Sequence, residues 1–305
     1  MTTISSARAV YVLARAVDYL GTAVFLGGLV FLALVWPAGA AVRSARRLVV
    51  IGWFLGMIGT VTAIGLQGVW ATDRPMADVL SADLLGQVLD LRFGQVWFAK
   101  ALLWVLAGVV LADLLARKEN AARSVPWRVG AGAVGLGLLR ATGMTGHIAE
   151  AGGTWWAQLA DLVHQCAISV WIGGLVMLLL GVLPRRQPDE LHTVVPRYSR
   201  FAMFSVLAIV STGALLGWQV LGGIDPLTTT DYGRLLLIKV GLLGVVLAAA
   251  FASKTWVDRR LDLAVARDGD VRTVRPFVFS VAAETVVVIF VLIAASLLVT
   301  ASPGR

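Results

Sequence analysis

The sequence predicts an all-α membrane protein that crosses the bilayer eight times. The chain of 305 residues is 58% hydrophobic and only 14% charged, whereas soluble proteins carry about 25% charged residues. Its apolar residues form runs of about 20, which is the length that a helix needs to cross the hydrocarbon core of a bilayer. The single cysteine excludes an internal disulfide. These observations exclude a soluble globule and leave membrane spans as the elements to assign.

Eight apolar segments are the candidate spans. They cover residues 12–36, 48–70, 95–116, 128–147, 157–183, 201–222, 233–256 and 277–300. The first segment is too long for the core of a signal peptide, and no small-residue cleavage site follows it, so we expect it to stay as a span.

The basic residues set the expected orientation of these spans. Nearly all loop Lys and Arg fall in the first, third, fifth and seventh connections: Arg43, Arg46, Arg47, Arg117, Lys118, Arg123, Arg128, Arg185, Arg186, Arg197, Arg200, Arg259, Arg260, Arg267, Arg272 and Arg275. Because positive loops stay cytoplasmic, both termini are expected to be extracytoplasmic in a bacterial plasma membrane. The net charge of +8 then reflects anionic lipids of the bilayer rather than nucleic acid, since the basic loops are short and carry no nucleic-acid-binding motif.

Two short patterns recur in the same order along the chain. FLGGLV begins at Phe25 and WIGGLV at Trp171, while FGQVWFAK begins at Phe93 and YGRLLLIK at Tyr232. Four spans separate the members of each pair, so the two parts have the same orientation, as in the parallel repeats of transporters. We therefore expect two similar four-helix halves, residues 1–125 and 126–305. Aligning the GGLV segments places Asp18 opposite His164.

Several charged residues fall inside the predicted spans, where an unpaired charge costs roughly 2.5–3.5 kcal/mol on insertion scales. Such residues normally face the interior of a bundle and pair with one another. The candidates for a polar pathway or for structural ion pairs are Asp18, Lys100, Arg140, Lys239 and Glu284.

The region around residues 144–164 gathers residue types that bind metals. His147 and His164 are expected near the outer surface, on adjacent antiparallel spans. Met144 precedes His147 by three residues and Asp161 precedes His164 by three, so each pair shares a helical face. Imidazole and carboxylate suit Cu(II), while thioether sulfur suits Cu(I). The sequence thus predicts a metal site of four residues, with hydrogen bonding between helices as the alternative role of the histidines.

The remaining candidates are weaker. Cys166 points away from His164 and is expected to act as a small buried hydrophobe, and His192 is expected in a solvated cytoplasmic loop. The chain contains no Gly-rich phosphate loop, no HExxH, no CxxC and no GxSxG. A transporter or binding protein is therefore expected rather than an enzyme.

Four stretches together resemble the copper resistance D (CopD) family of bacterial membrane proteins. They are Gly146–His147, ADLVHQCAISVWIGGL from Ala160, SRFAMFSVLAIVSTGALLGW from Ser199 and TTTDYGRLLLIK from Thr228. The eighth span, with Glu284, is similar as well. The resemblance implies an inner-membrane protein of eight spans that moves copper, as Cu(I) or Cu(II), between the outer side and the cytoplasm.

The resemblance also has implications for partners and for competing functions. Some relatives carry a fused periplasmic copper-binding domain; we expect none here, so that a separate extracytoplasmic copper-binding protein would deliver the ion. The YG…K element also resembles small membrane proteins that hold a b-type haem between a His and a Lys in porphyrin synthesis. Haem b near His147, His164 or Lys239 is therefore the alternative, and a membrane scaffold without any ligand is the third possibility.

Overall fold

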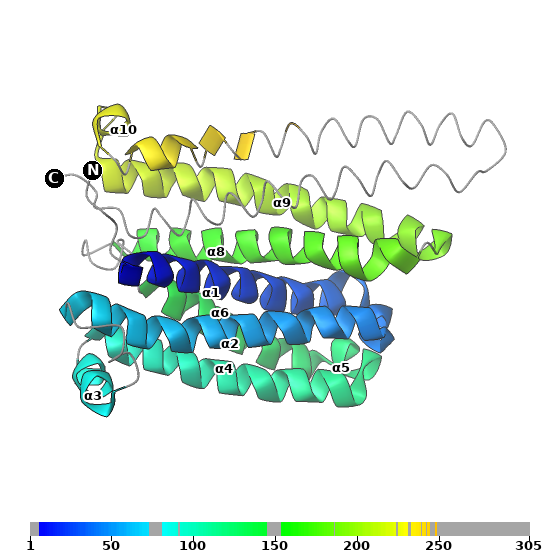
Figure 1. The fold of residues 1–305 in the computed structure, drawn as a ribbon. Coiled ribbons are helices and arrows are strands. Elements are labelled where there is room, and N and C mark those ends of the chain that lie inside the picture. The colour runs from blue at the N-terminus through cyan, green and yellow to red at the C-terminus, as the bar shows by residue number, and fades with distance from the viewer. Residues whose placement is uncertain are drawn as a thin grey trace.

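The computed structural model is a bundle of long helices (Figure 1). It describes residues 6–72, 81–90, 92–144, 154–185, 187–223, 225–230, 233–238, 240–241, 243–244 and 248. The part of the chain so described is helical and contains no strand, as the sequence predicts. Its elements are α1 (Ser6–Val30), α2 (Arg43–Thr72), α3 (Ala82–Asp90), α4 (Arg92–Arg117), α5 (Glu119–Arg123), α6 (Val125–Met144), α8 (Trp155–Val176), α9 (Pro188–Leu221) and α10 (Pro226–Thr229).

Two helices, α1 and α8, form the centre of the bundle. The span built on α1 is 72% buried inside the protein and that on α8 is 67% buried, against 28% for the spans of α4 and α9. The helix α1 packs against α2 and α8, while α8 packs against α1, α6 and α9. The outer helices instead expose large apolar side chains, among them Phe98, Leu106, Phe204 and Trp218. Such apolar outer faces suit contact with lipid tails, which are as apolar as leucine.

Glycines bring α1 and α8 into contact along their backbones. A Cβ atom built on Gly27 would overlap the carbonyl oxygen of Ser169 and lie 2.7 Å from Cα of Gly173. A Cβ built on Gly173 would overlap the carbonyl oxygen of Ala23 and lie 2.7 Å from Cα of Gly27. The contact is reciprocal: the GGLV segment of one helix packs on that of the other. Small residues allow membrane helices to approach this closely.

The same succession of backbone forms follows both GGLV segments. A π-helical segment, Phe31–Val35, continues α1 and a 3₁₀ turn, Pro37–Ala41, follows it. Likewise, the π-helical segment Met177–Val182 continues α8, and the 3₁₀ turn Leu183–Arg185 comes next. Each 3₁₀ turn contains a proline, which lacks the N–H donor of a regular α-helical turn.

Five helical segments of the described chain are long and apolar enough to cross a membrane. They are Val10–Val35, Arg43–Val69, Gly94–Arg117, Trp155–Arg185 and Asp189–Leu221, and they correspond to the first, second, third, fifth and sixth expected spans. The helix α6 covers the fourth expected span but is not among these five; it contains two arginines and five glycines. The seventh expected span is described only in part, and the eighth lies outside the described residues.

Long helices that follow one another along the chain alternate in direction (Figure 1). The C-terminal end of α6 therefore lies at the same end of the bundle as the N-terminal ends of α1 and α8. At the opposite end, α5 packs against the 3₁₀ turn Pro37–Ala41, and Arg128 Nη2 donates to the carbonyl oxygen of Ala33 over 2.7 Å. The basic connections that the structure describes, those after α1, α4 and α8, lie at that opposite end.

One expected loop is a helix. Residues 188–200, expected in the fifth connection, form the first turns of α9, which begins at Pro188. Proline is well suited to the first turn of a helix because its missing N–H would have no partner there. His192 lies on α9 and is exposed, so its expected solvation is confirmed while its expected loop conformation is wrong.

Candidate metal site

Asp161 lies where α8 meets the C-terminal end of α6. Its Oδ2 accepts a hydrogen bond of 2.6 Å from Gln165 Nε2, one turn further along α8. A Cβ atom built on Gly143 would overlap this oxygen, so the carboxylate fits against α6 only because residue 143 has no side chain. The half-buried Met144 is the next residue of the chain and the last of α6. The structure therefore brings Asp161 to the end of α6 that carries Met144.

His164 contacts a different helix. Its Nδ1 lies 2.9 Å from Thr212 Oγ1 on α9, and a Cβ built on the neighbouring Gly213 would lie 3.4 Å from the imidazole Cε1. The imidazole is half-buried. Although Asp161 and His164 are only three residues apart, the first contacts α6 and the second contacts α9.

The described residues thus contain only part of the predicted site. His147 lies outside them, as do Lys239 and Glu284. Among the residues that the structure does describe, no three His, Cys, Asp or Glu side chains gather in a group that could hold a metal ion. Cys166, half-buried on α8, packs against the main hydrophobic core, in keeping with its expected role as a small hydrophobe.

Arg140 adds a second polar contact between α6 and α8. Its Nη2 donates to Gln158 Oε1 over 2.6 Å. Although Arg140 precedes Met144 by one helical turn on α6, its guanidinium reaches Gln158, which lies nearer the N-terminal end of α8 than Asp161 does. Within the membrane an arginine needs such an internal partner, since lipid exposure is costly.

A separate polar centre lies between α1, α2 and α4, and its side chains are fully buried. Lys100 Nζ forms an ion pair of 2.6 Å with Asp18 Oδ2, and both side chains have 0% exposure. Thr60 Oγ1 donates to Asp18 Oδ1 over 2.8 Å and accepts from Trp104 Nε1 over 3.0 Å. Two of the candidate charges, Asp18 and Lys100, are therefore partners of each other, and Lys100 does not extend to the interface.

Arg15 lies one turn before Asp18, among aromatic rings. Its side chain is fully buried. Its Nη2 donates to Tyr19 Oη over 2.5 Å. The guanidinium carbon lies 5.1 Å from the ring centroid of Tyr19 and 5.2 Å from that of Trp97. Cation–π contacts of this kind help to hold a cation away from water.

Sequence reasoning missed the uncharged partners of these charges. They are Thr60, Trp104, Gln158, Gln165 and Thr212. Threonine and glutamine within spans often bond between helices. Gln158 and Gln165 each lie about one turn from Asp161, which was a signal in the sequence, whereas Thr60 and Thr212 have no candidate charge within a turn.

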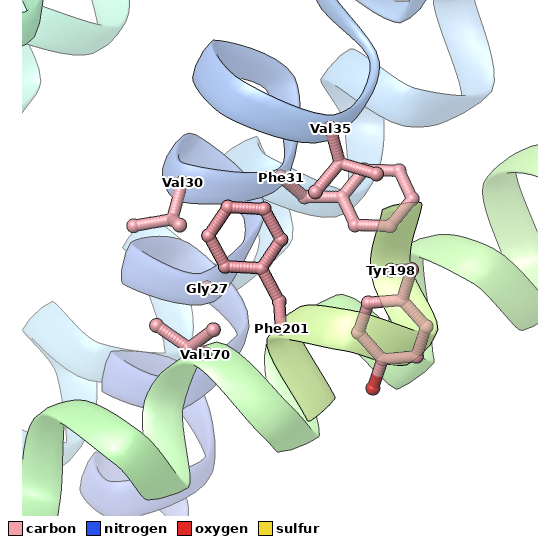
Figure 2. A pocket seen from close by; sticks show the side chains of 7 residues that line it. All are labelled: Gly27, Val30, Phe31, Val35, Val170, Tyr198 and Phe201. Atoms are coloured by element: carbon pink, nitrogen blue, oxygen red, sulfur yellow. The ribbon is translucent and has the colours of Figure 1, made fainter. Parts of the chain in front are cut away.

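An apolar pocket lies beside the contact between α1 and α8 (Figure 2). It is lined by Gly27, Val30, Phe31, Val35, Val170, Tyr198 and Phe201. The one hydroxyl among them, Tyr198 Oη, already donates to the carbonyl oxygen of Trp171 over 2.6 Å. Copper needs nitrogen, oxygen or sulfur ligands, so this pocket does not suit the ion.

The fold and these centres define a helical, multi-pass membrane protein with ionisable groups in its interior. The chain belongs to the copper resistance protein D family. Residues 4–157 match the profile of the copper resistance protein D-like N-terminal domain, and residues 192–298 match the copper resistance protein D profile. This family is of the copper resistance and transport type, in agreement with the expectation of a transporter rather than an enzyme.

Three curated proteins are similar to the chain. Copper transport protein CutJ of Bacillus subtilis is 29% identical over 252 residues, which cover 75% of this chain and 43% of CutJ. The inner membrane protein YebZ of Escherichia coli is 28% identical over 78% of this chain and 77% of its own length. Copper resistance protein D of Pseudomonas syringae pv. tomato is 26% identical over 86% of each chain.

These comparisons concern the two ligands that the sequence analysis considers, copper and haem b. The chain spans less than half of the length of CutJ. No solved structure matches it. The family and two of the relatives carry copper in their names, and the haem alternative finds no support among them.

Proposed function

We propose that this protein binds copper at the extracytoplasmic end of the bundle and transports it across the bacterial plasma membrane, in copper uptake or copper tolerance. Membership of the copper resistance protein D family supports copper as the substrate. The observation that carries the site is the contact of Asp161 with Gly143, because it brings a carboxylate of α8 to the end of α6 that carries Met144. His164 follows one turn later on α8 and His147 three residues after Met144 in the sequence.

Each of these side chains has a chemical role in the proposal. The imidazoles of His147 and His164 are the principal ligands, and Met144 completes the site when the ion is Cu(I), because thioether sulfur is soft. Asp161 either binds the ion or accepts a hydrogen bond from a ligand imidazole, as carboxylates around metal ligands commonly do. Arg140, whose guanidinium is bonded to Gln158 one turn before Asp161 on α8, acts as an electrostatic barrier or gate to a cation.

The charges of the first polar centre support placing the ion in the second half of the chain. Lys100 and Asp18 are already paired in full burial, and Arg15 is a second buried cation nearby. A copper ion entering there would meet two positive charges against one carboxylate. The described part of the second half instead offers an imidazole and a carboxylate on α8.

The basic residues support the orientation. Among the described residues, the basic connections that follow α1, α4 and α8 lie at the end of the bundle opposite to the C-terminal end of α6 and the N-terminal end of α8 (Figure 1). Positive ends of membrane helices stay cytoplasmic, so the proposed site opens outward, where a separate extracytoplasmic copper-binding protein can deliver the ion. No nucleotide-binding motif is present in the chain, so transport is facilitated, or is coupled to protons or to the membrane potential.

Copper titration of the purified full-length chain tests the proposal. His147→Ala and His164→Ala should each weaken copper binding at least ~10-fold, measured against a competing chelator of known affinity, and should lower copper uptake into proteoliposomes. His192→Ala is the matched control, because its imidazole is exposed on α9. Equal copper binding by all three variants would refute the site, and a haem absorption band in the purified protein would refute copper as the ligand.

A further inference from the structure

Two polar contacts recur at matching places in the bundle. Asp18 on α1 is bonded by Thr60 of α2, and His164 on α8 is bonded by Thr212 of α9. The same number of residues separates Asp18 from the reciprocal glycine Gly27 as separates His164 from Gly173. The two helices that carry these threonines also match around them, with Thr60, Gly65 and Gln67 on α2 and Thr212, Gly217 and Gln219 on α9.

The two threonine hydroxyls use their single proton differently. In the first centre the Thr60 oxygen accepts from Trp104 Nε1, and its proton goes to the Asp18 carboxylate. Trp104 has no counterpart of this kind in the second half. At the matching distance after Gly233 the chain has Leu243, whose side chain has no N–H to donate.

The proton of the Thr212 hydroxyl is committed to the backbone of α9. Its Oγ1 lies 2.5 Å from the carbonyl oxygen of Ala208, one turn earlier, and 3.4 Å from that of Ile209. In both contacts the hydroxyl is the donor and a carbonyl oxygen the acceptor, and a hydroxyl has only one proton. Toward His164 the Thr212 oxygen can therefore only accept, and the proton of that 2.9 Å bond must be on Nδ1 of the imidazole.

We propose that Thr212 is a positioning residue that holds His164 in the tautomer with the proton on Nδ1, so that Nε2 is the atom that binds copper. A neutral imidazole has one N–H and one lone pair, and fixing the proton on one nitrogen fixes the lone pair on the other. Metal-binding histidines commonly have their second nitrogen bonded in this way, which orients the ring. The inference rests on the proposed function, since it concerns which ring nitrogen of His164 binds the copper ion.

The nature of α9 makes Thr212 suitable for this role. The hydroxyl is buried, and its bond to Ala208 is a local one within α9, independent of any neighbouring helix. Gly213, next along α9, leaves the edge of the ring at Cε1 close to the helix backbone. His164 is thus held against α9 by its Nδ1 edge, while Asp161 on the same helix contacts α6.

Three variants of the full-length protein test the inference. Thr212→Val removes the hydroxyl at nearly constant shape and should weaken binding of the copper ion about 10-fold. Thr212→Ser keeps the hydroxyl and should bind copper as the parent protein does. Ser211→Ala is the matched control, because it removes the exposed hydroxyl of the adjacent residue.

A tautomer measurement provides a readout that a structural role of Thr212 would not change. Nitrogen chemical shifts of ¹⁵N-histidine in the copper-free protein, with the His164 signals assigned by their loss in His164→Ala, should show a protonated Nδ1. Thr212→Val should lose this preference and Thr212→Ser should keep it.

The possible results separate this inference from the proposed function. If His164→Ala loses copper binding while Thr212→Val binds as the parent does, or if His164 carries its proton on Nε2, the positioning role is refuted and the copper site stands. If His164→Ala binds copper as the parent does, both are refuted. A Thr212→Ser variant that behaves like Thr212→Val would also overturn the positioning role.

Discussion

The Asp18–Lys100 pair allows a quantitative test of how this bundle holds charge in its interior. Both side chains have 0% exposure, and removing one partner of a buried ion pair typically costs about 3–5 kcal/mol, because the other charge is left uncompensated. Lys100→Met leaves Asp18 with the Thr60 hydrogen bond and with Arg15 within Coulombic reach. Asp18→Asn instead leaves Lys100 and Arg15 as two buried cations, and should therefore be the more destabilising of the two changes.

The double variant Asp18→Asn/Lys100→Met should recover most of the loss, since replacing both partners of a buried pair is often close to neutral. The free energy of unfolding is measured by titration with sodium dodecyl sulfate in mixed micelles, followed by circular dichroism. Asp113→Asn is the control: its ion pair with Arg117 is on the surface, where ion pairs contribute little, and no change is expected. Single variants as stable as the parent, or a double variant that loses the sum of both, would refute the account.

Two further predictions concern the arrangement of the helices. Gly27→Ala should destabilise the protein by about 1–3 kcal/mol, because the new Cβ overlaps the backbone of α8. The control is Gly132→Ala on α6, where a Cβ meets nothing within 4 Å, and this change should be neutral or stabilising. Equal unfolding curves for the two variants would contradict the close contact. Reporter fusions after Lys118 and after Gly222 should report the cytoplasm and the outside respectively, since these residues lie at opposite ends of the bundle and the basic end is expected to be cytoplasmic. Reports from the same side would overturn the orientation and move the proposed copper site inward.

Hydropathy predicts the spans well, because a bilayer imposes both their length and their composition. Five expected spans coincide with helices of the described chain that can cross a membrane. The helix α6 shows a limit of hydropathy as a criterion. Arg140 and the glycines reduce the hydropathy of this helix, yet it packs between α4 and α8 inside the bundle. The helical start of α9 was missed because its polar residues follow no membrane pattern, although a helix can continue beyond the bilayer.

The partners of the buried charges could not be derived from composition or spacing. Asp18 and Lys100 were both expected inside spans, but they are 82 positions apart, and their pairing depends on how α1 packs relative to α4. The expected common face of Asp161 and His164 is correct as helical geometry, yet their contacts are set by two neighbours, α6 and α9. Contacts of this kind belong to helix packing, which a linear pattern does not specify.

The matching positions of Asp18 and His164 favour a division of roles between the two predicted halves. A carboxylate is charged at neutral pH, so in a low-dielectric interior it needs a cation, and the cation here is Lys100 of the protein itself. A neutral imidazole carries no such requirement and can offer its lone pair to a metal ion. The threonine that bonds each of them can serve both, because a hydroxyl donates to a carboxylate and accepts from an imidazole N–H. The Asp of α1 is thus paired with a cation of the protein itself, whereas the His at the matching position of α8 would, in the proposed site, offer its lone pair to an external ion. The reciprocal glycines and the matching threonines remain similar in the two halves, as expected if both halves share one helix packing but hold different ionisable residues.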